Sequence, residues 1–360
     1  MAIRRMRVIS ILLLISAHAN ATRMHAQWTL ESSNTTADLR GIHAVGGGVA
    51  WASGSNGTVL RTEDGGFLWQ TCTVPPGAEH LDFRGIQAFD ANTAIVMSSG
   101  KGDLSRLYKT SDGCHSWKLV FTNPDKEGFW DAILLNRFDT DGEILGDPVN
   151  GHFAFWETSD KGTTWVRQLT PGLEALKQEG AFAASNSALF DDERFATGFV
   201  TGGPAGPRVM VSEDTSQTGK FKARPIPLRG ASESAGGFSI NDRDWCCWVA
   251  VGGDYLKPGE SNGTASYTHD GGTTWRAAHT PPHGYRSSVV YDAATKTWIT
   301  VGPNGTDISI DDGRNWRAVH PNPAFNEVPG ADANWNAISL PFVVGPHGRI
   351  GKLDAEALAR

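Results

Sequence analysis

Sustained helical periodicity, cysteine spacings typical of metal sites and long apolar segments are all lacking in this 360-residue chain. Apart from a weak stretch near Leu173, no window repeats apolar residues with a helical period, which argues against an α-helical fold. The four cysteines form no Cys-x-x-Cys pair and no Cys/His metal spacing, and no Gly-x-Gly-x-x-Gly joins a strand to a helix. We therefore expect no metal and no cofactor.

Positive charge is also in short supply, because 32 Lys and Arg stand against 39 Asp and Glu, for a net charge of −7. This balance argues against a nucleic-acid partner. Three of the arginines precede a short apolar run at residues 8–15, which is followed by small residues, the pattern of a secretory signal peptide. We expect cleavage after Ala21 or Ala26 and export of residues 27–360 to the periplasm or cell exterior, as a monomer with no membrane span.

One motif recurs six times at intervals of roughly 40 to 55 residues, which indicates a repeat architecture. It reads Ser/Thr, any residue, Asp, a short turn containing glycine, then Trp. The five complete copies have their Asp and Trp at Asp64/Trp69, Asp112/Trp117, Asp160/Trp165, Asp270/Trp275 and Asp311/Trp316, and a degenerate copy has Ser212 and Asp214.

Physical chemistry assigns these motif residues a structural role. The hydroxyl and the carboxylate bind nearby backbone amides and lock a tight turn, and glycine supplies the positive φ that the turn requires. The Trp begins the next strand and packs between neighbouring sheets. The motif resembles the Asp-box, or BNR repeat, and this resemblance implies a β-propeller in which the repeated Asp residues are not catalytic.

A second element, strand–glycine turn–strand, occurs seven times, and the seventh copy at Val344–Gly348 continues to Asp354 without a box or a Trp strand. The missing strand is found at the other end, where Gln27-Trp28-Thr-Leu-Glu resembles the segments that follow each box. We predict an all-β, single seven-bladed β-propeller over 27–360, with the last blade closed by the N-terminal strand.

The cysteines leave several alternatives. Cys72 and Cys114 lie in adjacent blades and could meet at the periphery, although free or buried thiols are the favoured reading. Cys246 and Cys247 are placed on a strand, where neighbouring side chains face opposite sides and a mutual bond is disfavoured. The acidic Asp242-Arg-Asp244 before them is predicted to be a hairpin turn between the first two strands of a blade.

The box-free face should carry the site, because the starts of the seven innermost strands differ chemically although the scaffold repeats. Arg presents a planar fork for carboxylate or phosphate oxygens, so one interpretation is an anion-binding channel mouth. The other is that arginines and acids simply pair around a solvated channel. The residues concerned are Arg40, Arg84, Trp130, Asp131, Glu179, Glu233, Tyr285, Arg286, Trp335 and Asn336.

Two families compete for the functional prediction. Three Arg, a Tyr and several carboxylates raise a sialidase-like glycoside hydrolase as the alternative, although Phe83-Arg84-Gly-Ile matches its Phe/Tyr-Arg-Ile-Pro motif only loosely and sialidases have six blades. The mature chain more closely resembles photosystem II stability/assembly factor-like propellers, in a non-photosynthetic bacterial branch often labelled oxidoreductase. The runs Gly146-Asp-Pro-Val-Asn-Gly151 and Val251-Gly-Gly-Asp-Tyr-Leu-Lys-Pro258 are among those that carry this resemblance. It implies a secreted, non-catalytic scaffold that binds another protein, and the arginines at the channel mouth add an anionic small ligand as the other candidate.

Overall fold

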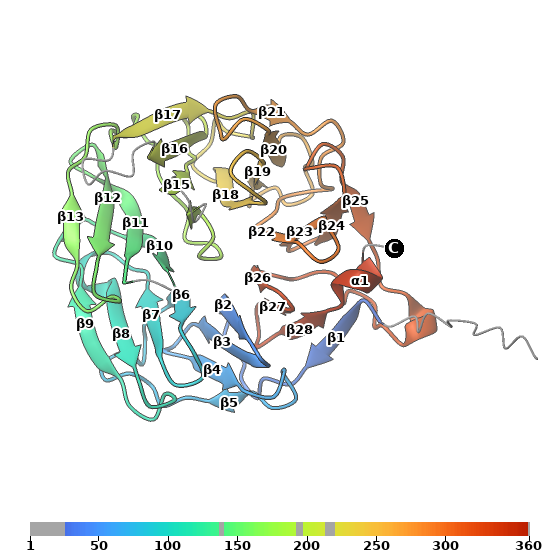
Figure 1. Cartoon of the computed structure of the whole chain (residues 1–360), viewed down its shortest axis with the longest axis horizontal. Coiled ribbons are helices and arrows are strands. Elements are labelled where there is room, and N and C mark those ends of the chain that lie inside the picture. The colour runs from blue at the N-terminus through green and yellow to red at the C-terminus, as the bar shows by residue number, and fades with distance from the viewer. Residues whose placement is uncertain (1–25, 137–139, 192–196, 213–219, 359–360) are drawn as a thin grey trace, which may run out of the picture.

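Seven four-stranded antiparallel sheets form a closed ring in the computed structural model (Figure 1). The structure describes residues 26–136, 140–191, 197–212 and 220–358. The predicted signal peptide, apart from Ala26, and the degenerate box at Asp214 therefore lie outside the described residues. The prediction of an all-β, seven-bladed β-propeller is confirmed.

Each blade is a meander that runs from an innermost to an outermost strand. Blade 1 comprises β2 (Leu39–Gly46), β3 (Val49–Gly54), β4 (Val59–Thr62) and β5 (Gln70–Thr71), and blade 2 comprises β6 (Phe83–Ala88), β7 (Ala94–Ser98), β8 (Arg106–Thr110) and β9 (Lys118–Thr122). Blade 3 comprises β10 (Trp130–Leu135), β11 (Gly142–Val149), β12 (His152–Thr158) and β13 (Val166–Gln168), and blade 4 comprises β14 (Leu189–Asp191), β15 (Thr197–Val200), β16 (Arg208–Ser212) and β17 (Phe221–Pro225).

The remaining blades follow the same order. Blade 5 comprises β18 (Ala235–Asp242), β19 (Trp248–Asp254), β20 (Ala265–Thr268) and β21 (Arg276–Ala277), and blade 6 comprises β22 (Ser288–Asp292), β23 (Thr297–Gly302), β24 (Gly305–Ser309) and β25 (Arg317–Val319). Blade 7 comprises β26 (Ala337–Ser339), β27 (Phe342–Val344), β28 (Ile350–Leu353) and β1 (Trp28–Glu31). Among the described residues, helical structure is confined to the 3-10 turns Gly102–Leu104 and Pro323–Phe325 and to α1 (Ala355–Leu358).

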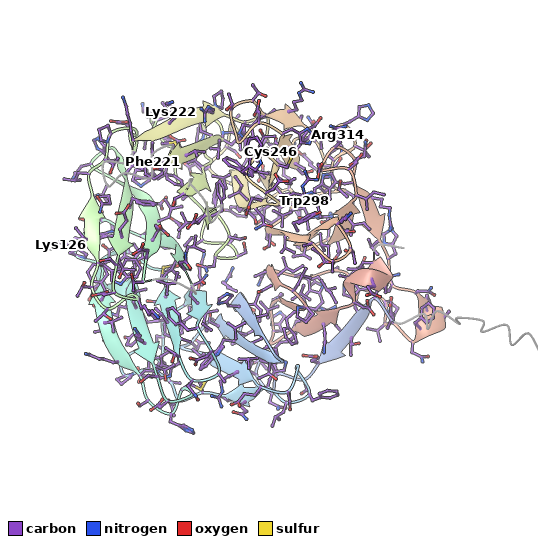
Figure 2. All side chains as sticks on the ribbon, in the orientation of Figure 1. Lys126, Phe221, Lys222, Cys246, Trp298 and Arg314 are labelled. Atoms are coloured by element: carbon purple, nitrogen blue, oxygen red, sulfur yellow. A yellow bond between two sulfur atoms is a disulfide. The ribbon has the colours of Figure 1, made fainter. Side chains whose placement is uncertain are left out.

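Ring closure follows the prediction. Strand β1 is the outermost strand of blade 7 and pairs with β28, with Trp28 opposite Leu353 and Glu31 opposite Ile350. Figure 1 shows the two strands side by side at the point where the ring is sealed. Only 3% of Trp28 is exposed, and its indole belongs to the apolar cluster between blades 6 and 7. In Figure 2 side chains fill the spaces between neighbouring sheets all around the ring.

The five complete boxes form the same turn between the third and fourth strands of their blades. In blade 3, Thr158 Oγ1 donates to Asp160 Oδ1 at 2.8 Å and accepts from Gly162 N at 3.1 Å. Asp160 Oδ1 also accepts from Thr164 N at 2.8 Å. Corresponding bonds occur in the other four boxes. The predicted turn-locking role is confirmed by these bonds.

The box tryptophans pack between sheets as predicted, but they do not begin the fourth strand. In every complete box the strand starts one residue later, so the indole-bearing residue is the last residue of the turn; these residues are Trp69, Trp117, Trp165, Trp275 and Trp316. The indole bonds back into its own turn in three of the boxes, where Nε1 donates to the carbonyl oxygen of the glycine three residues earlier, at 3.3 Å for Trp165, 3.1 Å for Trp275 and 3.0 Å for Trp316.

Blades 5 and 6 show why the strand starts late and how far the packing varies. The backbone N of Trp316 donates to Thr280 O, in the segment that leaves blade 5, at 2.8 Å, and so does not join the ladder of its own blade. Trp316 is 4% exposed and packs in the cluster between blades 5 and 6. Trp275 is only partly buried, against the cluster shared with blade 4, so the expectation of a buried indole holds less well there.

Two cysteine expectations are wrong. Cys72 and Cys114 form a disulfide between blades 1 and 2, because the turn of the second box brings its cysteine against the end of β5. Cys246 and Cys247 lie in the turn before β19 and not on a strand, and their Sγ atoms are 2.8 Å apart. The strand alternation that would have separated them does not apply there. Asp244 does lie in the predicted hairpin turn.

Among the described residues, none of the helical segments has the length and apolar character needed to cross a bilayer.

Candidate functional site

A cavity of about 1220 Å³ opens at the mouth of the central channel, and residues from all seven blades line it. Eight of the ten predicted site residues are in its wall: Arg40, Arg84, Asp131, Glu179, Glu233, Tyr285, Trp335 and Asn336. The boxes lie at the opposite ends of the strands. A second cavity of about 1090 Å³ lies at the closure seam beside β1 and β28 and contains none of the predicted residues.

A β-bulge at the start of the innermost strand positions several of these side chains. In blades 1, 2 and 3 the strand pairing skips one residue, and the skipped residues are Arg40, Arg84 and Asp131. Blade 5 has a bulge at Phe238, which also lines the cavity. A bulge inserts an unpaired residue and turns its side chain away from the normal alternation. The repeated scaffold therefore presents chemically different residues at one level of the channel.

Three cationic side chains line the mouth, namely the exposed Lys177 and the arginines Arg40 and Arg84, which lie beside the same carboxylate. Arg84 Nε donates to Asp82 Oδ2 at 2.7 Å, and Arg40 Nε lies 3.8 Å from the same oxygen. Arg84 Nη1 also donates to Ala183 O at 3.2 Å, and Arg40 Nε makes no hydrogen bond to any described residue. About 30% of each arginine side chain is exposed. Two guanidinium groups thus share one carboxylate, which leaves positive charge facing the cavity.

Two buried acids lie beside this pair. Burial raises the pKa of Asp131 well above its ordinary value, and the negative charge of the neighbouring Asp147 raises it further. The positive charge of Arg84 lowers this pKa but does not outweigh the other two effects. Burial also raises the pKa of Asp147, whose Oδ1 accepts from Ala181 N at 3.0 Å. Asp131 Oδ2 has no hydrogen-bond donor among the described residues. Raised pKa values favour the protonated carboxyls, so the mouth is less negative than its acid count suggests.

Glu179 is fully engaged within the protein. Arg208 donates to both of its carboxylate oxygens, from Nε to Oε1 at 2.8 Å and from Nη2 to Oε2 at 2.5 Å. Thr201 Oγ1 and Leu176 N donate the remaining bonds at 2.6 and 2.8 Å. The side chain is buried. Glu179 therefore fits the interpretation in which acids and arginines simply pair with one another. Arg40 and Arg84 do not, because they share one carboxylate and keep donors available for a ligand. The sequence pattern also predicts Glu179 at the start of the innermost strand of blade 4, but that strand, β14, begins only at Leu189.

Two predicted mouth residues are in the core. Trp130 is fully buried and stacks on Phe121 with ring centroids 5.3 Å apart. Its neighbour, the bulge residue Asp131, takes the channel-facing position. Arg286 is also fully buried, and its Nε donates to Asp307 Oδ2 at 2.8 Å while its Nη1 donates to Asn304 Oδ1 at 2.6 Å. The preceding Tyr285 lines the cavity, so the prediction of Arg286 at the mouth is wrong by one residue, in the segment that leads into β22.

An aromatic wall forms the side of the mouth contributed by blades 4, 5 and 6. Phe182 stacks on Phe238 with centroids 3.9 Å apart, and Tyr285 meets Phe238 edge-on at 4.8 Å. Tyr255, 48% exposed, also approaches Phe238 edge-on, at 6.2 Å. Burial raises the pKa of Tyr285, so its hydroxyl stays protonated at neutral pH. Sequence reasoning missed Phe238, because only its bulge brings it to the cavity.

Trp335 and Asn336 complete the mouth from blade 7. Trp335 is 1% exposed, and its Nε1 donates to Ala331 O at 3.1 Å. Asn336 Nδ2 donates to Leu39 O at 2.8 Å, which joins blade 7 to blade 1. Both residues thus border the cavity while holding the scaffold. Glu233 lines the cavity and is exposed.

Comparisons with known proteins agree with the predicted resemblance. The chain is 24% identical over 229 residues to the photosystem II assembly lipoprotein Ycf48 of Synechococcus sp. (strain CC9902), a match that spans 62% of this chain and 57% of that protein. The structure of this chain is similar to that of YCF48 bound to D1 peptide, with a TM-score of 0.64 at 16% identity, over 91% of this chain and 97% of the other. YCF48 from Cyanidioschyzon merolae gives a TM-score of 0.60 at 16% identity, covering 92% and 100%. No protein-family model matches the chain.

Proposed function

We propose that this chain is a non-catalytic binding protein whose channel mouth holds a segment of a partner protein through an acidic group. The observation that carries the proposal is the pair Arg40 and Arg84, which share one carboxylate at a cavity lined by all seven blades. A similar propeller, YCF48, has been solved with a bound D1 peptide, and this supports a peptide-like occupant.

The mouth offers two kinds of contact to such a segment. The guanidinium groups of Arg40 and Arg84 can donate paired hydrogen bonds to a carboxylate, which Arg does better than Lys because its donors are planar and fixed. The wall of Phe182, Phe238 and Tyr255 provides apolar surface for an adjacent side chain. Arg and aromatic residues commonly dominate binding energy at protein interfaces. A short acidic segment with one apolar neighbour fits both contacts.

The glycosidase alternative has less support. Its three arginines do not converge, because Arg286 is buried against Asp307 and does not line the cavity. Glu179 is held by Arg208 and Thr201, so neither of its oxygens is free to act on a glycoside. The similarity to assembly factors also supports a protein that is not an enzyme. An anionic small ligand could use the same arginine pair, and the binding assay distinguishes it from a peptide.

The signal peptide predicted for residues 1–26 supports a place for this binding outside the cytoplasm, in the periplasm or beyond the cell. The Cys72–Cys114 disulfide agrees with an oxidising compartment. Fractionation of cells that express the full chain tests the location, since a cytoplasmic, uncleaved product would contradict it.

Peptide selection tests the binding proposal directly. A random peptide display library is selected on residues 27–360, and the recovered peptides are measured by fluorescence anisotropy. We expect the peptides to share an acidic residue beside an apolar one. Replacing both Arg40 and Arg84 with Ala should weaken binding by roughly 100-fold or more, equivalent to about 3 kcal/mol. Arg276→Ala, on the exposed outer strand β21, is the matched control and should bind like the wild type.

Three results would overturn the proposal. One is peptide binding that survives the double arginine replacement. Another is tight binding of free dicarboxylates or phosphate with no selectable peptide, which would favour a small anionic ligand. A third is hydrolysis in a glycan screen that is abolished by Asp131→Asn, which would favour the enzyme.

A further inference from the structure

Three loops from blades 5 and 6 bring two thiols, an imidazole and two carboxylates together on the face opposite the channel mouth. Asp244, Cys246 and Cys247 belong to the turn between β18 and β19. His269 lies in the box of blade 5, directly after β20, and Asp312 lies in the box of blade 6, after β24. Figure 2 shows Cys246 in this sector of the ring, together with the labelled Trp298 and Arg314.

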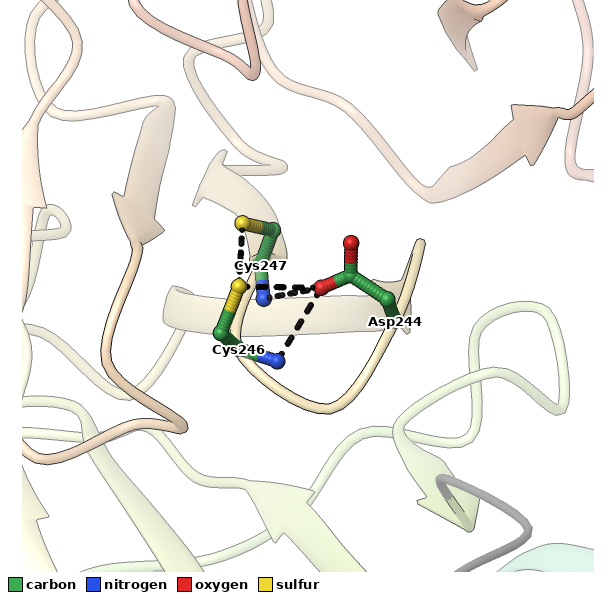
Figure 3. Close-up of side chains that lie close together, drawn as sticks. All are labelled: Asp244, Cys246 and Cys247. Atoms are coloured by element: carbon green, nitrogen blue, oxygen red, sulfur yellow. Dashed lines mark hydrogen bonds between the residues drawn. The ribbon is translucent and has the colours of Figure 1, made fainter.

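The turn holds both thiols on the same side. Asp244 Oδ1 accepts hydrogen bonds from Cys246 N and Cys247 N, each at 3.0 Å, and from Cys246 Sγ at 3.1 Å. Figure 3 shows this carboxylate facing the two cysteines, whose Sγ atoms are 2.8 Å apart. Cys247 is buried and Cys246 is partly exposed. Adjacent residues rarely present their side chains together, so this turn creates a dithiol that a strand would not.

The other two groups face the buried thiol from neighbouring loops. Ligand atoms of Cys247, His269 and Asp312 all lie within 4.8 Å of one another. His269 Nε2 is 3.9 Å from Asp312 Oδ2, and this buried ring nitrogen makes no hydrogen bond to a described residue. The other ring nitrogen, Nδ1, lies 3.3 Å from Arg314 Nη2. A buried imidazole nitrogen without a hydrogen-bond partner, facing a carboxylate and a thiol, is the arrangement that a metal ion would complete.

The position of Asp312 in its box adds to this arrangement. The residue that follows the box Asp has positive φ in all five complete boxes and is glycine in three of them. Lys161 and Asp312 adopt the same left-handed conformation, with φ of 56° and 59°, without being glycine. Asp adopts this conformation more readily than most residues other than glycine, so the turn tolerates Asp312 without requiring it. Lys161 is exposed to solvent, whereas Asp312 is partly buried and faces Cys247 and His269.

We propose that Cys246, Cys247, His269 and Asp312 form a binding site for a thiophilic divalent cation, with Zn²⁺ as the best match. Zn²⁺ prefers four ligands drawn from thiolates, imidazole and carboxylate. Cys247, His269 and Asp312 supply three whose ligand atoms lie within 4.8 Å of one another, and Cys246 Sγ, 2.8 Å from Cys247 Sγ, is the fourth candidate. Two thiolates and the carboxylates of Asp312 and the adjacent Asp244 carry four negative charges, two more than Zn²⁺ supplies. Arg243 offsets one of them, since its Nη2 donates to Cys247 Sγ at 3.0 Å and its Nη1 donates to Asp312 Oδ1 at 2.8 Å.

Binding requires a local rearrangement. Two thiol protons leave to solvent, and the Sγ atoms move apart so that each lies about 2.3 Å from the ion. Because Arg314 can only donate to His269 Nδ1, the ring proton lies on Nε2, and it must move to Nδ1, with loss of that contact, before Nε2 can bind the ion. Asp312 Oδ2 is available because Arg243 and Trp298 bind its Oδ1. The ion would join the β18–β19 turn and the box of blade 5 to the box of blade 6. The site is independent of the channel mouth and would hold two blades together at their box ends.

Cobalt substitution tests the site with a readout of ligand identity. Residues 27–360 are purified anaerobically, with mass spectrometry used to show the Cys72–Cys114 disulfide intact and Cys246 and Cys247 reduced. One equivalent of Co²⁺ should give a thiolate-to-cobalt charge-transfer band with tetrahedral visible absorption, and Zn²⁺ should displace it. Cys247→Ser should abolish the band. His269→Ala and Asp312→Asn should each weaken Zn²⁺ binding by at least about 10-fold.

His347→Ala, at a histidine that is 87% exposed, is the matched control and should leave affinity unchanged. Circular dichroism of each variant shows whether the propeller remains folded, and Zn²⁺ should raise the melting temperature of the wild type and not of Cys247→Ser. The proposal is overturned if the reduced protein shows no charge-transfer band, or if the band survives in Cys247→Ser. It is also overturned if His269→Ala and Asp312→Asn both bind Zn²⁺ as tightly as the wild type.

Discussion

Trp28→Ala should destabilise the propeller far more than a substitution at an exposed position of the same strand. Strand β1 is four residues long, yet it supplies the outer strand of blade 7 and seals the ring. The Trp28 indole is 3% exposed and packs with Leu353 and Leu358 in the cluster between blades 6 and 7. Truncation of a buried Trp costs about 3–5 kcal/mol, from lost transfer free energy and the cavity that remains.

Leu30→Ala provides the matched control. Leu30 is in the same strand and pairs with Gly351, but 40% of it is exposed. Its truncation should change the free energy of unfolding by less than about 0.5 kcal/mol. Urea unfolding followed by circular dichroism measures both variants, and equal slopes are required before the midpoints are compared. Closely similar midpoints for Trp28→Ala and Leu30→Ala would refute the closure argument.

Deletion of residues 27–33 extends the same test. It removes Glu31, whose Oε2 accepts from Trp69 Nε1 at 2.8 Å and so connects blade 7 to the first box. It also leaves the edge of β28 unpaired. An unpaired strand edge recruits other chains, so the deletion variant should form dimers or larger species on size-exclusion chromatography. A monomer with unchanged thermal unfolding would show that the ring does not depend on β1.

Three further predictions concern stability. Asp160→Ala should lower the free energy of unfolding by about 1 kcal/mol in urea titrations, and Asp160→Asn by less because it keeps one acceptor for the turn amides. Replacing Cys72 and Cys114 with Ser should cost about 4 kcal/mol by the same assay, because the disulfide closes a loop with a sequence separation of 42; an unchanged midpoint would refute this. Burial, and next the charge of Asp191, raise the pKa of Glu143 to about 8, so the wild type loses stability as pH rises from the ordinary value of 4.5 towards 8. Glu143→Gln should therefore be more stable than the wild type by up to about 3 kcal/mol at pH 7, and melting curves should show the gain fading as pH falls to 4.5.

The propeller could be predicted from sequence because its repeated features are local. Thr158 and Asp160 satisfy backbone amides a few residues away, so the same letters give the same turn wherever they recur. The closing strand was recognisable because Trp28 occupies a position equivalent to Trp117 and Trp165, which follow boxes. Such local chemistry is independent of the distant parts of the chain. The exact start of each fourth strand could not be predicted in this way, because it depends on contacts outside the blade: Trp316 donates its backbone N–H to Thr280 O, outside blade 6.

The site was only partly predictable, because strand faces depend on register. A shift of one residue moves a side chain to the other face of a sheet. Bulges at Arg40, Arg84 and Asp131 bring these residues to the channel. Arg286 instead precedes β22, outside any strand, and its guanidinium is buried against Asp307. The bulges depend on pairing with the second strand, which a single strand sequence does not contain.

Contacts between loops were the least predictable features. Cys247, His269 and Asp312 are separated along the chain by 22 and 43 residues in the numbering. Cys247 lies outside the boxes, and the other two lie in boxes of different blades, so no spacing rule could connect them. Their proximity depends on the angle between blades 5 and 6. The Cys72–Cys114 disulfide has the same origin, since it joins the end of the last strand of one blade to the box of the next.

The two proposed sites occupy the two places where this scaffold departs from its own repeat. At the channel mouth the bulge is shared by several blades, and the residue it carries changes from Arg84 to Asp131 to Phe238. On the opposite face the box turn is shared, and Asp312 stands where three other boxes have glycine. In both cases the bulge or turn is needed to keep the blade folded, whereas the identity of the side chain on it can vary without loss of the fold. A side chain that the turn or bulge does not require is where a propeller of this kind acquires a function.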